Sequence, residues 1–279
     1  MGVLDRAARR QANGETFALA TVVRTLSVTA AKAGAKALIT PDGVIEEGWI
    51  GGGCARAAVL KAARLCMVDG QSRLVSITPK ELLEDLGVSP GQESGGVLYA
   101  KNSCPSQGTM DIFVEPVLPS PKLLILGSSP VALALAKLAP HMGFVVAVAA
   151  PTADLAKFEA APAKIDGFSA PADFGVDGFI VVSTQGAGDR AALKIAASTP
   201  ARYRSFVGSR RKAETLRQEL AAEGLAPENL AAVKAPAGLD LHAISIEEIA
   251  LSILAEMVAV RRRAQIADVA TQSGGASHV

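Results

Sequence analysis

The hydrophobic positions along this chain of 279 residues follow two patterns, and the change comes near residue 120. Before it, short apolar runs, partly β-branched, stand between polar segments, which predicts strands. After it, apolar runs alternate with helical patterns, which predicts a parallel sheet covered by helices on both faces. The first set is residues 17–24, 37–40, 44–47, 73–77 and 110–114, and the second is 123–127, 144–149, 178–184 and 205–209. The sequence thus predicts an α/β protein with a smaller α/β domain first and a parallel-sheet domain second.

Two capping signals predict helix starts. Thr78, Pro79 and Glu81 have the order of an N-cap, a first helical residue and a capping-box partner, which predicts a short helix. Ser245 and Glu248 have capping-box spacing before a long apolar stripe, and three arginines at 261–263 are placed at the C-terminal end of that last helix. Residues 89–106 are interpreted as a loop.

A run of prolines marks the domain boundary. Residues 114–122 read VEPVLPSPK, and three prolines within six positions disfavour helix and central strand alike. The predicted organisation is an N-terminal domain over 1–117, a proline-rich linker over 118–121 and a C-terminal domain over 122–279 that ends in a frayed tail.

Charge and composition exclude several classes of protein. Twenty-eight basic and 27 acidic residues give a net charge of +1, so the chain has no broad positive field for nucleic acid. The longest charge-free stretches, 123–136 and 138–153, are shorter than the roughly 20 residues of a membrane span, and no apolar run follows the N-terminus as in a secretory signal. Three widely spaced cysteines indicate free thiols in a reducing compartment, which favours the cytoplasm.

Three consecutive glycines followed by a cysteine precede a predicted helix over 55–67. The N–H groups of Gly51, Gly52 and Gly53 suit an anion such as phosphate, and the helix N-terminus lowers the pKa of the Cys54 thiol. The alternative is a tight strand-to-helix turn with Cys54 as a small buried hydrophobe.

The other two cysteines lie in different contexts. Cys104 lies in a turn-rich, exposed segment and, if it folds near Cys54, shares a substrate with it. Cys66 falls inside the alanine-rich helix and is assigned to the core.

A turn after the first strand of the second domain has the position of a dinucleotide-binding turn. Gly127 matches the first glycine of that pattern, Ser128 follows it, and Ser129 stands where the second glycine is needed. No acidic residue follows the second strand at the position that binds ribose hydroxyls. These departures argue against NAD, and a nicotinamide- or flavin-dependent oxidoreductase remains the alternative function.

A second strand-to-helix turn, Gly208-Ser209-Arg210-Arg211-Lys212, places three cations in the first turn of a helix. They oppose the helix dipole, and an anionic ligand would remove that penalty. Arginine suits a bidentate grip on phosphate, although the side chains can instead point to solvent or pair with carboxylates. The three histidines have no metal-ligand spacing, so no metal site is predicted.

Taken together, these segments resemble the XdhC/CoxI family of molybdoenzyme maturation factors, and the form of the chain is most similar to the CO dehydrogenase accessory, CoxF-like branch. The resemblance covers 17–117 and 122–263 through these segments: ATVVRT (20–25), GAK (34–36), GWIGGGC (48–54), GTMDIFVEP (108–116), FVGSRRK (206–212), APAGLD (235–240) and EEIALSILAE (247–256). Cys54 matches the family's GGGC cysteine, and Cys104 falls near a second cysteine-containing segment.

The resemblance implies a Rossmann-like second domain, a homodimer, and an accessory factor rather than an enzyme. It further implies binding of the molybdenum cofactor, in its pterin or cytosine dinucleotide form, and help with its sulfuration or delivery to a molybdenum hydroxylase of the xanthine dehydrogenase or aerobic CO dehydrogenase type. A sulfur donor such as a cysteine desulfurase is a further expected partner. The remaining alternative is a docking module that only recognises the target enzyme.

Overall fold

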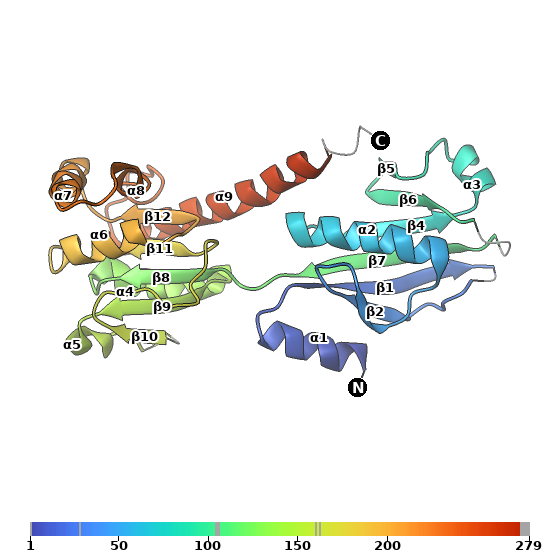
Figure 1. Cartoon of the computed structure of the whole chain (residues 1–279), viewed down its shortest axis with the longest axis horizontal. Helices are drawn as coiled ribbons and strands as arrows, with labels where there is room; N and C mark the ends of the chain where they lie inside the picture. The colour runs from blue at the N-terminus through green and yellow to red at the C-terminus, as the bar shows by residue number, and fades with distance from the viewer. Residues whose placement is uncertain (1, 28, 104–106, 160, 162, 274–279) are drawn as a thin grey trace. The chain divides into compact units, whose positions relative to one another are not determined.

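The computed structural model describes residues 2–27, 29–103, 107–159, 161 and 163–273, with the side chains of residues 54 and 264–273 excepted. The chain divides into two compact units: the first holds the residues up to Pro119 together with those from Ala264 onward, and the second runs from Ser120 to Arg263. Figure 1 shows a sheet with its own helices in each unit.

The first unit is built on a mixed sheet, which in the described part of the chain has the strand order β3-β2-β1-β7-β4-β6-β5. All neighbours pair antiparallel except β4 and β6, which are parallel. The strands are β1 (Phe17–Leu26), β2 (Lys36–Ile39), β3 (Ile45–Gly48), β4 (Arg73–Thr78), β5 (Glu93–Ser94), β6 (Val97–Lys101) and β7 (Thr109–Val117). The helices are α1 (Val3–Ala12), α2 (Gly53–Asp69) and α3 (Lys80–Asp85).

Helix α2 covers the core of this unit. Its Val59, Ala62, Ala63 and Cys66 side chains are buried against alternate residues of the central strands, among them Ala18, Ala20, Val22, Ile112 and Val114. The helix ends at Gly70, whose φ of +71° is the left-handed C-cap conformation that glycine adopts without strain. The long apolar face of α2 therefore fixes its N-terminal end at one edge of the sheet.

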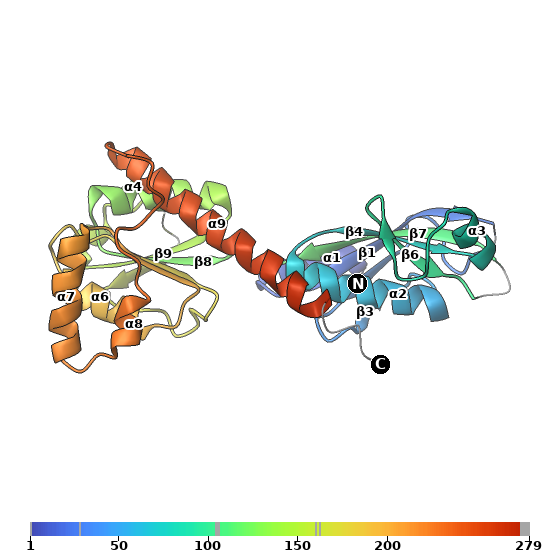
Figure 2. The same cartoon turned by 90° about the horizontal axis from the view of Figure 1, so that it is seen from above.

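The second unit holds an all-parallel sheet of order β10-β9-β8-β11-β12 in the described residues (Figure 1). Figure 2 shows this sheet between two layers of helices. Its strands are β8 (Lys122–Leu126), β9 (Val145–Ala150), β10 (Ala163–Asp166), β11 (Phe179–Val182) and β12 (Tyr203–Phe206). Its helices are α4 (Pro130–Leu138), the 3-10 helix η1 (Ala139–Met142), α5 (Thr152–Leu155), α6 (Asp189–Ser198), α7 (Arg210–Ala222), α8 (Pro227–Ala231) and α9 (Ile246–Ser273).

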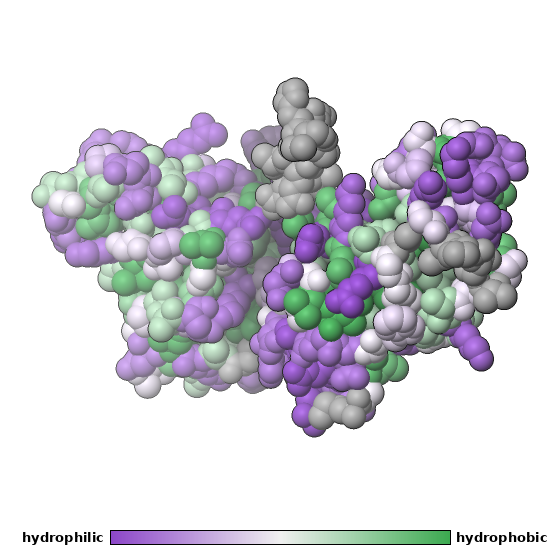
Figure 3. All heavy atoms as spheres, turned by 45° about the vertical axis from the view of Figure 1, so that its right-hand side comes forward, coloured by the Kyte–Doolittle hydropathy of each residue, from purple (hydrophilic) through white to green (hydrophobic). Residues whose placement is uncertain are grey.

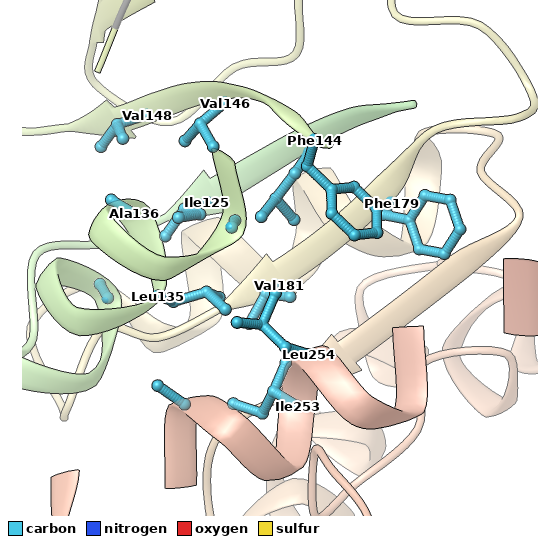
Figure 4. Packing of buried hydrophobic residues seen from close by; sticks show 14 of the residues in the cluster. Ile125, Leu135, Ala136, Phe144, Val146, Val148, Phe179, Val181, Ile253 and Leu254 are labelled. Carbon is cyan, nitrogen blue, oxygen red and sulfur yellow. The ribbon is translucent and has the colours of Figure 1, made fainter. Parts of the chain in front are cut away.

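Two apolar clusters cover the two faces of this parallel sheet. One gathers residues of α4 and α9 under the sheet, where Phe144 and Phe179 meet edge to face at 5.2 Å (Figure 4). The other packs α6, α7 and α8 against the opposite face. The chain turns from β8 outward to β9 and β10 and then crosses to β11, so the strand order reverses between β8 and β11. This confirms the predicted α/β class with a Rossmann-like parallel sheet.

The proline run does not exclude a central strand. Strand β7 runs through Pro116, which pairs with Ala18 of β1. Strand β4 pairs with β7 only as far as Val114, so Pro116 lies where β7 has a single neighbour, as proline in a sheet requires. The expectation that no strand passes through these prolines was wrong for Pro116, because only Pro119 and Pro121 lie between β7 and β8.

Three local predictions are also corrected. Thr78 is the buried last residue of β4, with its hydroxyl 3.0 Å from Ser76, and Pro79 is the N-cap of α3. The expected loop over 89–106 contains β5 and β6, because β6 adds to the edge of β4. The arginines at 261–263 lie inside α9, whose Arg261 donates to the Met142 carbonyl oxygen at 3.1 Å.

The Ser245 capping box is confirmed: Glu248 N–H donates to Ser245 Oγ at 3.2 Å, and Ser245 N–H donates to the Glu248 carboxylate at 2.9 Å. Helix α1 was not predicted, because its strongly charged sequence has no buried face. Within the described ranges no helix is long and apolar enough to cross a membrane.

Candidate functional site

The glycine turn of the first unit opens α2. Gly51 has φ +108° and packs so closely that a Cβ there would lie 3.2 Å from Met110 Cε and 3.3 Å from Ala55 Cβ. Gly53 has φ +45° and no atom within 4 Å of the Cβ position. The glycines thus differ: Gly51 permits close packing, whereas Gly53 leaves open space at the start of the helix.

Gly52 is the N-cap of α2, and among the described residues no side chain accepts a hydrogen bond from the first N–H groups of the helix. The Ala55 N–H donates to the Gly52 carbonyl oxygen at 3.2 Å, so the N–H groups that precede it at the start of the helix are the ones available to an anion. Trp49 lies beside them: its Cη2 is 3.8 Å from the Cβ position of Gly52, and 53% of the residue is exposed. An exposed tryptophan beside free N–H donors offers a flat apolar surface next to an anion site. Sequence reasoning assigned no role to Trp49, although it is the sole tryptophan of the chain.

The two cysteines expected to carry chemistry lie outside what the structure describes. Cys54 belongs to the first turn of α2, but its side chain is outside the described residues, and so is the whole of Cys104. Cys66 is fully buried, as the sequence predicts, with its thiol 3.6 Å from the Val114 carbonyl oxygen. Burial raises the pKa of the Cys66 thiol, which keeps it protonated and unreactive.

In the second unit, the β8–α4 turn lies where the strand order reverses, the position at which open α/β sheets bind ligands. Gly127 has φ +117°, and a Cβ there would lie 2.4 Å from the Ser183 carbonyl oxygen. Ser129 is the N-cap of α4 and accepts from Ala132 N–H at 3.2 Å. Its Oγ lies 2.6 Å from Ser183 Oγ, and both residues are buried. The two hydroxyl groups are therefore hydrogen-bonded to each other at the point where the strand order reverses.

The neighbouring polar groups are also paired. Ser128 Oγ donates to the Asp154 carboxylate at 2.7 Å, and Lys157 pairs with the same carboxylate at 2.6 Å. Hydrogen bonds from Lys157 and then Ser128 lower the pKa of Asp154. The predicted site residues Gly127, Ser128 and Ser129 are therefore engaged in hydrogen bonds or close packing within the protein.

Asp189 at the start of α6 is the buried anion of this region. Thr184 Oγ1 and Gly186 N–H donate to it, the latter at 3.0 Å, and Lys212 forms an ion pair with it. Burial alone would raise the pKa of Asp189, but the hydrogen bonds from Lys212, Thr184 and Gly186 outweigh it and hold the pKa below its usual range. Lys212, one of the three cations of the β12–α7 turn, is thus neutralised by the protein itself.

The other two cations of this turn are free of such partners. Ser209 is the N-cap of α7 and accepts from Lys212 N–H at 3.2 Å. Arg210 and Arg211 are exposed, and neither forms an ion pair with a described residue. The structure separates them: Arg211 lines a hollow of about 330 Å³ with Ser209, and Arg210 lines a cavity of about 430 Å³ with Gly208.

A buried network that sequence reasoning missed supports one wall of the larger cavity. Glu256 of α9 accepts from Tyr203 Oη at 2.6 Å and from Gly238 N–H at 2.9 Å, and it pairs with Lys234. Burial, followed by the bond to Glu256, raises the pKa of Tyr203 well above its usual range. The signal available in the sequence was a glutamate next to the apolar stripe of α9, one residue before the buried Met257.

The chain is similar to known proteins over most of its length. Residues 10–78 match the family described as XdhC and CoxI family, and residues 123–257 match the XdhC Rossmann domain. A protein of Escherichia coli (strain K12), described as uncharacterized protein YqeB, is 26% identical over 276 residues. That match covers 95% of this chain and 47% of the relative, so the chain spans about half the length of the curated relative it matches.

Among solved structures, the chain is similar to a crystal structure described as a xanthine dehydrogenase from Bacillus halodurans. The two are 20% identical, the comparison covers 94% of this chain and 96% of the other, and the TM-score is 0.46.

Proposed function

The chain belongs to the XdhC and CoxI family, which implies a general role in molybdoenzyme maturation, and from this we propose that it is an accessory protein that binds the molybdenum cofactor and helps to sulfurate or deliver it. The recipient would be a molybdenum hydroxylase of the xanthine dehydrogenase or aerobic CO dehydrogenase type. The cofactor is the cargo of such a protein, and the chain itself would not turn over a substrate.

The observation that carries this proposal is the open N-terminus of α2. It combines the backbone N–H groups of a helix start without a side-chain cap, an open position at Gly53 and the exposed Trp49. A phosphorylated pterin has an anionic end and a flat ring system, and this turn offers a donor set for the first and an apolar surface for the second. Cys54 follows in the same turn, where the helix N-terminus favours the thiolate.

The β12–α7 turn of the second unit would be a separate anion-binding surface. Arg210 and Arg211 are exposed guanidinium groups without an ion-pair partner among the described residues, and a phosphate or pyrophosphate suits their fork of donors. Gly208 and Ser209 belong to this part of the proposal. Gly127, Ser128 and Ser129 were included on sequence grounds, and their internal hydrogen bonds and close packing make them the weakest members.

The finer parts of the proposal rest on the family. Cys54 and Cys104 would hold or transfer sulfur near the molybdenum, a cysteine desulfurase would be the donor, and the chain would act as a homodimer in the reducing cytoplasm. The CO dehydrogenase accessory branch is the proposed subgroup. The paired hydroxyls at Ser129 and Ser183 give no support to the alternative of a nicotinamide- or flavin-dependent oxidoreductase.

The test is retention of the cofactor. The protein is coexpressed with the cofactor biosynthesis enzymes, purified without oxygen, and its bound pterin is released, oxidised and measured by fluorescence. We expect pterin in the wild type and at least a fivefold lower yield in Cys54→Ala combined with Arg210→Ala. Wild type without pterin, or a double variant that retains as much as wild type, would refute the proposal.

Two features of the chain give matched controls. Cys66→Ala removes a thiol from the core, so it should retain pterin while it lowers stability slightly. Trp49 is the only tryptophan, so its fluorescence reports directly on the glycine turn. Cofactor added to the apo protein should quench this emission, and Cys66→Ala should show the same quenching.

A further inference from the structure

A cavity lies beside Arg210 in the second unit. It measures about 430 Å³, within the range of roughly 300–1,000 Å³ typical of small-molecule sites. It is formed by the β12–α7 turn, the segment 234–243 and the first turns of α9.

The polar groups of this cavity include two cations, Arg210 and Lys234, and one carboxylate, Asp240. The Arg210 guanidinium is exposed and forms no ion pair with a described residue. Lys234 Nζ donates to the Gly238 carbonyl oxygen at 2.7 Å and pairs with Glu256, so one of its three N–H donors is left over. Asp240 lies at the cavity with His242, 3.4 Å away, and its carboxylate is an acceptor for a hydroxyl or amino group.

The remaining wall is apolar. Leu239, Leu241 and Ile249 line it, and Leu239 and Leu241 remain 40% and 52% exposed. Exposed leucines at a cavity offer contact to a flat, weakly polar ring. In Figure 3 hydrophobic residues appear as separate patches between hydrophilic ones, so in that view exposed apolar surface is confined to small areas.

Close packing and hydrogen bonds to α9 hold the cavity wall at Gly238 and Leu239 in place. Gly238 has φ +91°, and a Cβ there would lie 2.3 Å from Ser252 Oγ, so the segment lies directly on α9. Gly238 N–H donates to Glu256, and Leu239 N–H donates to the Ser252 carbonyl oxygen at 3.1 Å. The buried Glu256 therefore holds both Lys234 and the backbone of the apolar wall, which gives the cavity a preformed shape.

We propose that this cavity binds a phosphate ester of a flat heterocycle, with the phosphate on Arg210 and Lys234 and the ring against Leu239 and Leu241. The inference deepens the proposed function and rests on it in one respect: the phosphorylated end of the cofactor is one source of such a group. A free nucleoside monophosphate is the other source of the same chemistry. The cavity assigns different roles to the two arginines, because Arg211 lines a separate hollow.

The experiment is isothermal titration of the full chain with cytidine and adenosine 5′-monophosphates, with cytidine and inorganic phosphate as partial ligands. We expect at least one monophosphate to bind at least tenfold more tightly than either partial ligand. Arg210→Ala should weaken that binding at least tenfold, and Lys194→Ala, which removes an exposed cation of α6, should leave it unchanged. Equal binding of phosphate and monophosphate, or binding unchanged in Arg210→Ala, would overturn the proposal.

A second variant separates the ring from the phosphate. Leu241→Ser leaves the charge of the cavity unchanged and removes apolar surface from an exposed residue, so the fold is retained. It should weaken monophosphate binding about threefold to fivefold and leave phosphate binding unchanged. A variant that binds the monophosphate as tightly as wild type would count against the ring contact.

The pterin assay distinguishes this inference from the proposed function. Monophosphate binding that depends on Arg210 in a protein that retains no pterin would support the cavity and refute the cofactor role. Pterin retention by wild type and Arg210→Ala alike, with no monophosphate binding, would refute the cavity and leave the cofactor role standing. Loss of both in Arg210→Ala would identify the cavity as the site of the phosphorylated end of the cofactor.

Discussion

The β8–α4 and β12–α7 turns of the second unit are the same local structure in different surroundings. Each follows a parallel strand, and each is capped by a serine, Ser129 or Ser209, that accepts a backbone hydrogen bond at 3.2 Å. The caps have nearly the same backbone, with φ of −65° and −66°. Around Ser129 the protein supplies the partners, whereas the turn at Ser209 presents two arginines to solvent.

The difference shows that a strand–turn–helix motif does not make a ligand site by itself. The β8–α4 turn lies where the strand order reverses, which is the position of a dinucleotide site. Its serine hydroxyls are already hydrogen-bonded, Ser128 to Asp154 and Ser129 to Ser183. The turn after β12 has no glycine fingerprint, but it keeps cations that oppose the helix dipole and line two hollows. Unsatisfied charge, rather than position in the fold, distinguishes the candidate binding turn.

The largest predicted effect separates the glycines of the two turns. Gly127→Ala would place a Cβ against the backbone of Ser183 at a φ of +117°, and we expect it to destabilise the second unit by about 3 kcal/mol. Gly208→Ala meets only the side chain of Phe206 and has no positive φ, so about 1–2 kcal/mol is expected. Urea unfolding followed by circular dichroism measures both, and a larger loss for Gly208→Ala would contradict the comparison.

The ion pair of Asp189 with Lys212 comes next. Asp189→Asn leaves the lysine without its carboxylate and should cost about 2 kcal/mol at neutral pH. Because the folded chain holds the pKa of Asp189 below its ordinary value of about 3.9, its contribution is complete above that pH and is lost as the pH falls through the lower folded value. Wild type and variant should therefore converge in stability in acid. A difference that stays constant from neutral pH down to about pH 2 would show that the charge contributes nothing.

Substitution of the two capping serines tests how the surroundings of each turn contribute to stability. Ser209→Ala removes one exposed cap and should cost about 1 kcal/mol. Ser129→Ala removes an equivalent cap and also leaves the buried Ser183 hydroxyl without its 2.6 Å partner, so about 2 kcal/mol is expected. Thermal unfolding of the two variants side by side gives the ranking, and equal losses would mean that the serine pair adds nothing to the cap.

The smallest effect has the opposite sign. Arg211 lies in the first turn of α7, where a cation opposes the helix dipole, so Arg211→Glu should stabilise the unliganded protein by about 0.5 kcal/mol. The gain should shrink when the salt concentration rises. Calorimetry at low and high salt measures it, and a loss of stability would indicate that Arg211 has a favourable interaction in the free protein.

Much of the fold was accessible from the pattern of apolar residues. Periodicity predicts the strands of the first unit that begin at Phe17, Arg73 and Thr109, because each of these strands buries an apolar face. It also predicts the alternation of strands and helices in the second unit, for the same reason. Strand β6 was missed because it buries little: its residues are at most half-buried, and its outer neighbour is the two-residue strand β5. Helix α1 was missed because it has no buried residues and its Arg6 and Arg10 are held by ion pairs with Glu46, which is distant in the sequence.

The candidate site was accessible in part. The glycine turn, Cys54 and the arginines of the β12–α7 turn stand out as residue types at helix starts. Trp49, Lys234 and Glu256 do not, because their importance depends on neighbours distant in the sequence: Glu256 meets Tyr203 across 53 positions. Whether a polar group is satisfied is a question of three-dimensional contacts, which no local pattern contains.

By itself, the sequence determined the class of the fold, the start of α9 at its capping box and the residue types available at each turn, because periodicity and capping act over a few residues. Only the tertiary structure decided which of those turns are self-satisfied. It paired Lys212 with Asp189, joined Ser129 to Ser183, and left Arg210 beside a cavity fixed by Glu256. The physical reason is that a charge or hydroxyl without a partner in the packed protein gains more from a ligand than one that the protein already pairs.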